Sequence, residues 1–414
     1  MKILFLSHYY PPEGNAPASR VSALAERWAA EGCEVTVVTG VPNVPDGVVY
    51  PGYRNRWLPR VETVNGVKVV RVWTYIAPNK GTVRRIANYL SYCWSAVGYN
   101  LCAKRPDVLI ATSPQFFCGW AGVLLHWFRR IPFLLEIRDI WPESMSAVEA
   151  GLPGPVLKVL GVMEKIMYRS AGHIVTVGPG YVEKLIERGV PEEKISVIMN
   201  GVDKKLFFPR PPDQKLLESC GLTGKFVCSY IGTIGMACGL KTALDAAEEL
   251  KKRGRSDIVL VLVGDGAQRE TLEQEAKARR LDNCIFTGRR PKAEMPDWVA
   301  SSNVNLVHLR KTELFKTVMP SKIFESAGCA RPMIIGVDGF AKQLVLDAGA
   351  GLAMEPENAG ELTDLLIKLA DDPALCETMG QNALTRIASR YDRDTQAMEY
   401  LEILNRFVRE RQKK

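Results

Sequence analysis

Lys322 and Glu325 stand one helical turn apart in the segment 319–325, which reads MPSKIFE. Ser321 is a residue type that caps helix N-termini, and Pro320 stops a helix from extending backwards, so the segment predicts a helix that begins at Ser321. The first backbone amides of such a helix point at a nearby anion. The Glu325 carboxylate has the chemistry to accept hydrogen bonds from sugar or ribose hydroxyls. The segment therefore indicates an anion site, and the alternative is an ordinary capped helix with a solvated glutamate.

Other candidate positions end or follow short apolar runs that are typical of β-strands. Ligands of parallel sheets bind beyond the carboxyl ends of the strands, so these positions have the greatest weight. They are His8, Arg138 and Asp139 in the first half of the chain, and Gly232, Thr233, Gly235, Gly264, Asp265 and Arg289 in the second. Gly14 and Asn15 open the first expected helix. A single histidine at a strand end is more often structural, so both interpretations of His8 stay open.

The elements that must position these residues alternate regularly along the chain. Apolar runs alternate with amphipathic segments, which predicts α/β domains with parallel sheets and helices on both faces. The expected strands are 2–7, 33–39, 67–74, 108–112, 133–138, 174–177, 195–199, 226–231, 258–263, 284–287, 304–308 and 332–335. A Pro-rich, non-periodic stretch at 200–213 is typical of a linker. We predict two doubly wound domains, 1–203 and 204–392, that face each other across a cleft, and a helix at 393–414 that packs back toward the first.

Composition and missing motifs exclude several classes of protein. The chain has 414 residues, 47% of them hydrophobic, which suffices for two cores. Its ten cysteines include no Cys-x-x-Cys pair, so we expect reduced, mostly buried thiols in a cytosol and no zinc site. No Gly-x-Gly-x-x-Gly follows the first strand, which disfavours a nicotinamide oxidoreductase. The absence of a Gly-x-Ser-x-Gly elbow disfavours an α/β hydrolase.

The positive charge is concentrated in one segment. The net charge is +8, yet residues 51–105 hold ten basic side chains, Lys80 among them, and one acid, Glu62. The segment is either a solvated face or a surface for anionic lipid, because Tyr89, Tyr92 and Trp94 lie on the same helical stretch. Nucleic acid is disfavoured, since no DNA- or RNA-binding pattern appears. The uncharged stretches 86–103 and 108–128 contain polar residues and a proline turn, so we expect neither to span a bilayer.

Several motifs together resemble one known family. They are Asn200-Gly201-Val202-Asp203, the turn 232–235, Gly264-Asp265-Gly266, Phe286-Thr287-Gly288-Arg289 and the segment 319–325. In this order they resemble the retaining glycosyltransferases of family four, which have the GT-B fold. Residues 138–144 (RDIWPES) and the Pro-Ser-Lys-x-x-Glu segment look closest to a subgroup that transfers N-acetyl-fucosamine or related amino sugars in bacterial surface-polysaccharide assembly.

The resemblance implies that the second domain binds the nucleotide sugar. Arg289 would lie beside the base, Glu325 would bind the ribose, and the 232–235 turn would lie under the diphosphate. The loop that holds phosphate and sugar would contain Thr317, Met319, Pro320, Ser321 and Lys322. In the family a Glu-x7-Glu pair ends at the position of Glu325. Thr317 stands where its first glutamate is expected, which leaves the donor sugar open.

The resemblance also implies a cation for the diphosphate. Thr233 and the Cys238-Gly239 pair stand where the family has an arginine and a lysine. GT-B enzymes generally bind no metal, and the leaving diphosphate gains negative charge in the transition state, so a substitute is required. The candidates are Lys241, Arg310, Lys311 and Lys322.

In the first domain, the resemblance places acceptor and leaving-group contacts at His8 and at Gly14-Asn15. Arg138 and Asp139 lie near the position where the family often has a histidine that contacts the donor sugar. Asp139 would orient the acceptor hydroxyl or take its proton. The alternative is an aspartate that caps the turn before Trp141 and Pro142.

The sequence thus predicts a retaining, metal-independent GT-B glycosyltransferase that uses a UDP-sugar and no other cofactor. We expect transfer of an N-acetylated hexosamine, with or without a 6-deoxy group, to a polyprenyl-diphosphate-linked saccharide, at the cytoplasmic face of a bacterial plasma membrane, in O-antigen or capsule synthesis. The rival hypothesis is a catalytically inert sugar-nucleotide-binding or scaffold protein of the same fold.

Overall fold

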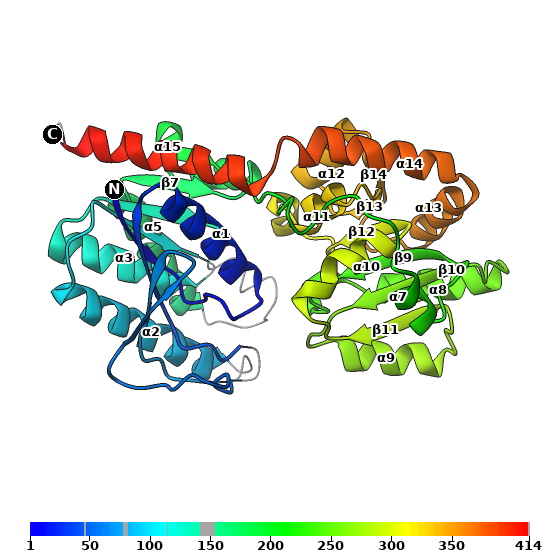
Figure 1. The fold of residues 1–414 in the computed structure, drawn as a ribbon, viewed down its shortest axis with the longest axis horizontal. Helices are drawn as coiled ribbons and strands as arrows, with labels where there is room; N and C mark the ends of the chain where they lie inside the picture. The colour runs from blue at the N-terminus through cyan, green and yellow to red at the C-terminus, as the bar shows by residue number, and fades with distance from the viewer. Residues whose placement is uncertain (45–46, 78–81, 114, 141–153, 413–414) are drawn as a thin grey trace. The chain divides into compact units, whose positions relative to one another are not determined.

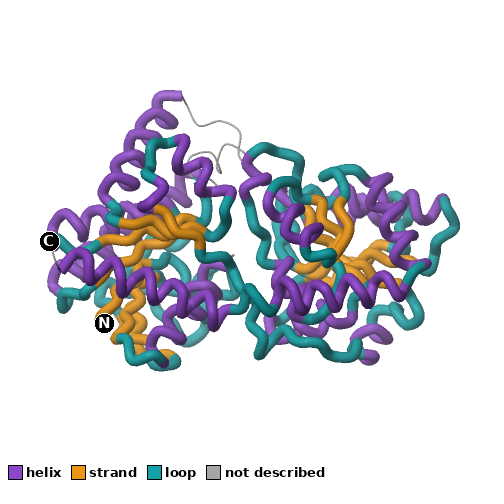
Figure 2. Tube along the Cα trace, turned by 90° about the horizontal axis from the view of Figure 1, so that it is seen from above, coloured by secondary structure: helices purple, strands orange, loops and turns teal. Residues whose placement is uncertain are grey.

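The computed structural model describes residues 1–44, 47–77, 82–113, 115–140 and 154–412. The chain divides into two compact units: unit 1 contains Met1–Met199 and Asp394–Lys414, and unit 2 contains Asn200–Arg393. Each unit is an α/β domain built on a largely or wholly parallel sheet, which confirms the predicted fold class of two Rossmann-like domains (Figures 1 and 2). Lys80 and residues 141–144, which entered the predictions, lie outside the described residues.

Unit 1 contains an eight-stranded sheet in the order β3-β4-β2-β1-β5-β6-β7-β8. Its strands are β1 (Lys2–Leu6), β2 (Glu34–Thr39), β3 (Arg60–Val64), β4 (Val67–Arg71), β5 (Val108–Thr112), β6 (Phe133–Ile137), β7 (His173–Thr176) and β8 (Ile195–Val197). All neighbours are parallel except β3 and β4. The carboxyl ends of β1, β4 and β6 therefore share one edge of the sheet.

Helices cover both faces of this sheet. They are α1 (Ala16–Ala30), α2 (Thr82–Cys102), α3 (Phe116–Arg129), α5 (Gly154–Ser170), α6 (Gly180–Glu187) and α15 (Arg393–Gln412), with a short turn η1 (Glu192–Lys194). Strand side chains alternate between the faces, so Leu4 and Leu6 join the core under α2, α3, α5 and α6, whereas Ile3 and Phe5 join the core under α1 and α15. The helices α1 and α15 lie side by side (Figure 1).

Unit 2 contains a six-stranded parallel sheet in the order β11-β10-β9-β12-β13-β14. Its strands are β9 (Phe226–Ile231), β10 (Ile258–Val263), β11 (Cys284–Gly288), β12 (Val304–His308), β13 (Met333–Gly336) and β14 (Gly351–Ala353). This is the 3-2-1-4-5-6 order of nucleotide-binding folds, in which the strand order reverses between the first and fourth strands. The reversal places the preferred ligand position at the carboxyl ends of β9 and β12.

The remaining elements of unit 2 are helices and short turns. The helices are α7 (Gln214–Ser219), α8 (Lys241–Lys252), α9 (Arg269–Ala278), α10 (Met295–Ser301), α11 (Lys322–Gly328), α12 (Phe340–Asp347), α13 (Ala359–Asp371) and α14 (Pro373–Asn382). The turns are η2 (Met236–Cys238), η3 (Lys292–Glu294), η4 (Leu314–Thr317) and a π-helical segment η5 (Ala383–Ala388). Local caps begin α7, α13 and α14, where Asp213, Asn358 and Asp372 accept backbone N–H bonds.

Two strands were not predicted. The strands β3 and β4 form an antiparallel hairpin whose turn is Asn65-Gly66, with φ of 49° and 80°. Such a pair of left-handed residues is the standard two-residue hairpin turn, so the Asn-Gly dipeptide was the signal that could have predicted β3. The strand β14 has three residues and no comparable signal.

None of the ten cysteines forms a disulfide bond, and six of them are buried. Among the residues that the structure describes, no helix combines the length and apolar character needed to cross a membrane.

Candidate functional site

Backbone hydrogen bonds join the turn after β9 to the turn after β10. Gly232 N donates to Val263 O at 2.8 Å, and Ile234 N donates to Asp265 O at 2.9 Å. Gly264, with φ of 145°, packs so closely that an added Cβ would lie 1.9 Å from Gly232 O. A side chain at position 264 would collide with the backbone of residue 232, so glycine is required at this contact for a steric reason. The predicted positions Gly232, Thr233, Gly235, Gly264 and Asp265 are thus brought together at one edge of the sheet.

Lys322 lies over this glycine turn. Its Nζ atom is 4.7 Å from the centre of the Tyr230 ring, and a Cβ on Gly232 would come within 2.9 Å of Nζ. The Tyr230 hydroxyl in turn donates to Thr233 O at 2.9 Å. The aromatic face stabilises the ammonium group and holds it against the turn. This arrangement places a positive charge directly above the backbone at the carboxyl end of β9.

The other three candidate cations have carboxylate partners. Lys241 donates to Asp245 at 2.8 Å, Lys311 pairs with Glu355, and Arg310 lies 3.7 Å from Glu357. In contrast, Lys322 has no ion pair within the described part of the chain. Of the four candidates, Lys322 is therefore the cation that is free to bind an anion.

Glu325 lies one turn further along α11 and is partly buried. Burial raises the pKa of its carboxyl group above the usual value, while the positive charges of Arg393, Lys322 and Lys292 act in the opposite direction. Its carboxylate receives no hydrogen bond from any residue in the described ranges. A half-buried carboxylate without a donor has the chemistry to accept hydroxyl groups from a ligand.

The rest of the 317–322 loop behaves partly as predicted. Ser321 does precede α11, but its own backbone is helical (φ −62°, ψ −23°) and its hydroxyl makes no capping bond, so the predicted side-chain cap is wrong. Thr317 is buried and its hydroxyl donates to Leu314 O at 2.7 Å. Met319 is buried and Pro320 is half-buried beside it. Arg289, after β11, is exposed.

His308 was not predicted as a site residue. Its ring links two loops: Nδ1 donates to Cys238 O at 2.7 Å, and Nε2 accepts the Glu357 N–H at 3.0 Å. These two bonds define a neutral tautomer, and burial lowers the pKa of the ring. Gly336 makes room for it, because a Cβ there would lie 2.4 Å from the ring. The contacts come from distant segments, so the sequence carried no signal for them.

In unit 1, His8 follows β1 and lies in an aromatic box. It is buried, and its ring centre is 4.7, 5.6 and 4.8 Å from those of Tyr9, Tyr89 and Tyr92. Burial lowers the pKa of His8 to about 3, against a smaller opposite effect of Asn88. The imidazole is therefore neutral at physiological pH, which fits a contact or packing role better than that of a cation.

Gly14 and Asn15 do open α1, as predicted. Asn15 Oδ1 caps the helix by accepting the Ala18 N–H at 2.9 Å, and Gly14 is exposed with open space around it. The neighbouring Glu13 was missed. It is buried, accepts the N–H groups of Asn43 and Val44, and has its pKa raised by burial to about 7.

Arg138 and Asp139 lie at the carboxyl end of β6. Both backbone N–H groups donate to Ser113 Oγ, at 2.7 and 3.2 Å, which fixes the turn. Burial raises the pKa of Asp139 to about 6, and the charge of Arg138 partly opposes this. The Nε and Nη1 atoms of Arg138 are buried and have no hydrogen-bond partner among the residues that the structure describes. Within the described residues, this end of unit 1 therefore holds a carboxyl group with a raised pKa and a guanidinium group with two unpaired nitrogens.

The aromatic stretch on α2 is divided between two environments. Tyr89 and Tyr92 belong to the core, where Tyr92 donates to Val38 O, so the prediction that they suit a headgroup interface is wrong. Trp94 is 64% exposed, and Leu90, Leu101 and Val83 are exposed on the same helix. Helix α2 is amphipathic. Tyr89 and Tyr92 are three residues apart and so lie on the same, buried face of the helix, whereas Trp94 lies on the exposed face.

Comparisons with known proteins agree with this architecture. The family model for the glycosyl transferase 4-like domain matches residues 15–201, and the model for glycosyl transferases group 1 matches residues 218–386. The fold is that of GT-B glycosyltransferases. It is similar to sucrose-phosphate synthase from Thermosynechococcus elongatus (TM-score 0.76, 18% identity, 98% of both chains) and to HepE from Anabaena in complex with UDP and glucose (TM-score 0.72, 18% identity, 98% and 99%).

Curated relatives show the same relationship in sequence. A protein of Escherichia coli K12 assigned to colanic acid biosynthesis as the glycosyl transferase WcaI is 25% identical over 87% of this chain and 90% of its own. The alpha-D-kanosaminyltransferase of Streptomyces kanamyceticus is 30% identical over 43% of this chain and 45% of its own. The chain belongs to the glycosyltransferases that combine a family-4-like domain with a group 1 domain.

Proposed function

We propose that this protein transfers an N-acetylated hexosamine, with retention, from a UDP-sugar to a lipid-linked saccharide in bacterial surface-glycan synthesis. The observation that carries the proposal is the position of Lys322 over the Gly232 turn, without a carboxylate partner in the described part of the chain. A diphosphate that leaves from this position gains negative charge in the transition state, and a fixed ammonium group stabilises it. The carboxylate of the neighbouring Glu325 accepts hydrogen bonds from the ribose hydroxyls.

The donor site uses unit 2 and no further cofactor. Arg289 lies beside the base, and the 232–235 turn supports the diphosphate. Two observations favour a UDP-sugar: the strand order of unit 2 is that of nucleotide-binding folds, and a protein of similar fold, HepE, was solved with UDP-glucose. Thr317 has no carboxylate to offer the donor sugar, unlike the glutamate that the family has at this position. Its hydroxyl cannot replace that carboxylate, because it already donates to Leu314 O.

The acceptor site uses the carboxyl edge of the unit 1 sheet. Asp139 accepts the proton of the attacking hydroxyl, for which a pKa near 6 leaves the carboxylate ionised at neutral pH. The unused N–H groups of Arg138 bind an anionic part of the acceptor. The relative assigned to colanic acid biosynthesis supports an acceptor in polysaccharide assembly.

Unit 1 would also approach an anionic membrane from the cytoplasmic side. The support is the excess of basic residues at 51–105 together with the exposed Trp94 on α2. Arg84, at the start of α2, is exposed. Vesicles containing phosphatidylglycerol should bind the wild type at low salt and release it at high salt, because screening weakens the attraction. The double variant Arg84→Glu/Arg85→Glu should not float; equal flotation of both proteins would contradict membrane binding.

The experiment for the reaction is turnover of a UDP-sugar panel with a polyprenyl-diphosphate-linked saccharide. We expect release of UDP together with a lengthened acceptor, and loss of turnover in Lys322→Met with smaller loss of UDP binding. The second candidate, an inert sugar-nucleotide-binding protein, is favoured by the missing glutamate at Thr317. It predicts binding of UDP-sugars without UDP release for every donor and acceptor.

A further inference from the structure

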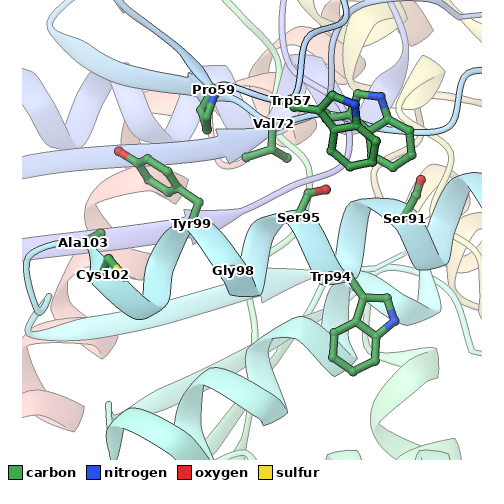
Figure 3. A pocket seen from close by; sticks show the side chains of 11 residues that line it. Trp57, Pro59, Val72, Ser91, Trp94, Ser95, Gly98, Tyr99, Cys102 and Ala103 are labelled. Atoms are coloured by element: carbon green, nitrogen blue, oxygen red, sulfur yellow. The ribbon is translucent and has the colours of Figure 1, made fainter.

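A groove of about 780 Å³ runs along α2 in unit 1 and has no role in the site described above. One side is formed by Trp57, Pro59 and Trp73, and the other by α2 from Ser91 to Cys102 and by Ala103, which follows it. Figure 3 shows Tyr99 and Ser95 projecting from α2 toward the segment that carries Pro59 and Trp57, whereas Trp94 leaves the helix on the other side. The groove has the volume of a small-molecule site.

The wall of the groove is an exposed aromatic stack. The rings of Trp57 and Trp73 lie 4.1 Å apart with an angle of 16° between their planes. One face of Trp57 is covered by Trp73, yet the side chain remains 76% exposed. At Gly98, on the opposite side, an added Cβ would meet nothing within 4 Å. A large apolar surface left open beside empty space marks a binding surface.

The lining favours a hydrocarbon over a sugar. None of the described residues that line the groove carries a carboxylate, amide or basic group. The Ser91 hydroxyl is already used, because it accepts the Tyr75 N–H at 2.7 Å and donates to Asn88 O. Apart from the indole N–H groups, Ser95 and Tyr99 supply the remaining side-chain hydroxyls of the lining. A saccharide would find few partners there for its hydroxyl groups, whereas an apolar chain needs none.

The charge around the groove specifies an anionic end on that chain. Arg54 and Arg56 precede Trp57, and Lys104 follows Ala103; all three are exposed and have no ion pair within the described residues. Glu62, the one acid of the segment, already pairs with Arg60 and Arg71. The surroundings of the groove are therefore positive and complementary to a phosphate.

The position of the groove suits a molecule whose other end reacts. Trp73 lies two residues beyond β4, at the same sheet edge as His8 and Asp139. From there α2 leads away toward the opposite edge, over about 18 Å between Ser91 and Ala103 at the rise of an α-helix. A chain that begins at the carboxyl edge and extends along α2 connects the acceptor site to this groove.

We propose that the groove binds the prenyl chain of a prenyl-phosphate-linked acceptor, with its phosphate beside Arg54 and Arg56, which precede Trp57. This inference rests on the proposed function, since it specifies the lipid part of the same acceptor. It assigns Trp57, Trp73 and Tyr99 as contacts of the chain.

The test is binding of farnesyl phosphate to the full-length protein, followed by tryptophan fluorescence. We expect Gly98→Leu, which fills the groove, to weaken binding at least tenfold. The matched control is Gly161→Leu on α5, another helical glycine with open space around it, which should bind as the wild type does. Trp57→Ala, at an exposed position, should also weaken binding.

Three further probes identify what is recognised. Farnesol should compete weakly and inorganic diphosphate should not displace the chain, whereas maltohexaose should have no effect. Competition by maltohexaose would overturn the proposal in favour of a glycan site, and equal affinity of wild type and Gly98→Leu would overturn it altogether. UDP binding, measured on the same samples, separates the outcomes: intact UDP binding without farnesyl phosphate binding contradicts only this inference, and absent UDP binding contradicts the proposed function.

Discussion

The strand ends of unit 2 and those of unit 1 differ in how far their polar groups are already paired. In unit 2 the turns after β9 and β10 are joined by backbone hydrogen bonds, and His308 uses both ring nitrogens to hold neighbouring loops. In unit 1 the corresponding edge contains Asp139 with a raised pKa and Arg138, two of whose buried nitrogens have no partner in the described part of the chain. The strand ends of unit 2 are thus fixed by hydrogen bonds within the protein, whereas those of unit 1 include buried nitrogens that no described residue pairs with.

Under the proposed function, the difference follows from what each site binds. A nucleoside diphosphate is the same in every reaction cycle, so backbone geometry and a single ammonium group would recognise it at low entropic cost. An acceptor brings its own hydroxyl and anionic groups, and these can complete the partners that unit 1 lacks. The four predictions below test whether rigidity in unit 2 and titratable groups in unit 1 are real properties of the two sites.

The largest expected effect concerns the glycine turn. Gly264→Ala forces a Cβ against Gly232 O and should lower the free energy of unfolding by about 3 kcal/mol. Gly14→Ala in unit 1, where nothing lies within 4 Å, is the matched control and should leave stability unchanged. Urea denaturation followed by circular dichroism measures both. Equal stabilities would mean that the unit 2 turn is not rigid.

The next effect concerns the ribose contact. Glu325→Gln should weaken UDP binding by about 1.5 to 3 kcal/mol, because an amide accepts hydroxyl hydrogen bonds less strongly than a carboxylate. Glu313→Gln, at an exposed position of the same unit, is the control and should bind UDP normally. Titration calorimetry gives both affinities. An affinity of Glu325→Gln within twofold of the wild type would remove the ribose assignment.

A smaller effect is expected from pH. The pKa of Asp139 is raised from 3.8 to about 6, so its carboxylate is lost as the pH falls through 6, and kcat/KM should drop about tenfold between pH 7 and pH 5. Asp139→Asn should be slower and lack this acid limb. By linkage, burial of the charge also makes the folded state less stable as pH rises from about 4 to about 6. A flat wild-type profile would assign Asp139 to the turn alone.

The smallest effect is an expected absence of titration. With a pKa of about 3, His8 should show no change in its imidazole NMR shifts between pH 5 and pH 8. His8→Gln should therefore leave the shape of the pH–rate profile intact, whatever it does to the rate. A titration near pH 6.5 would show that the aromatic box is open to water.

The sequence revealed those features that depend on neighbours in the chain. Glycines after strands, the Asn15 cap and the 317–325 segment all rest on local geometry, which short-range rules describe. His308 depends on Gly336 and Glu357, and the buried pair of Arg20 with Glu136 joins residues 116 positions apart. Such contacts exist only after folding. The predicted cap at Ser321 is wrong for a different reason: the backbone of that residue is helical, which prevents its hydroxyl from capping the helix.

Helix α15 has a consequence for the order in which the protein is made. Its Tyr400 and Leu404 belong to the unit 1 core, and Trp28 on α1 donates to Ala397 O at 2.8 Å. A ribosome reaches these residues only after all of unit 2 has been translated. Until then, one face of the unit 1 sheet is covered by α1 but not by α15 and stays partly exposed to chaperones and proteases. Unit 2 has all its residues and can fold first. Termination of translation before Asp394 would therefore destabilise unit 1, which is synthesised first, and leave unit 2 with all of its residues.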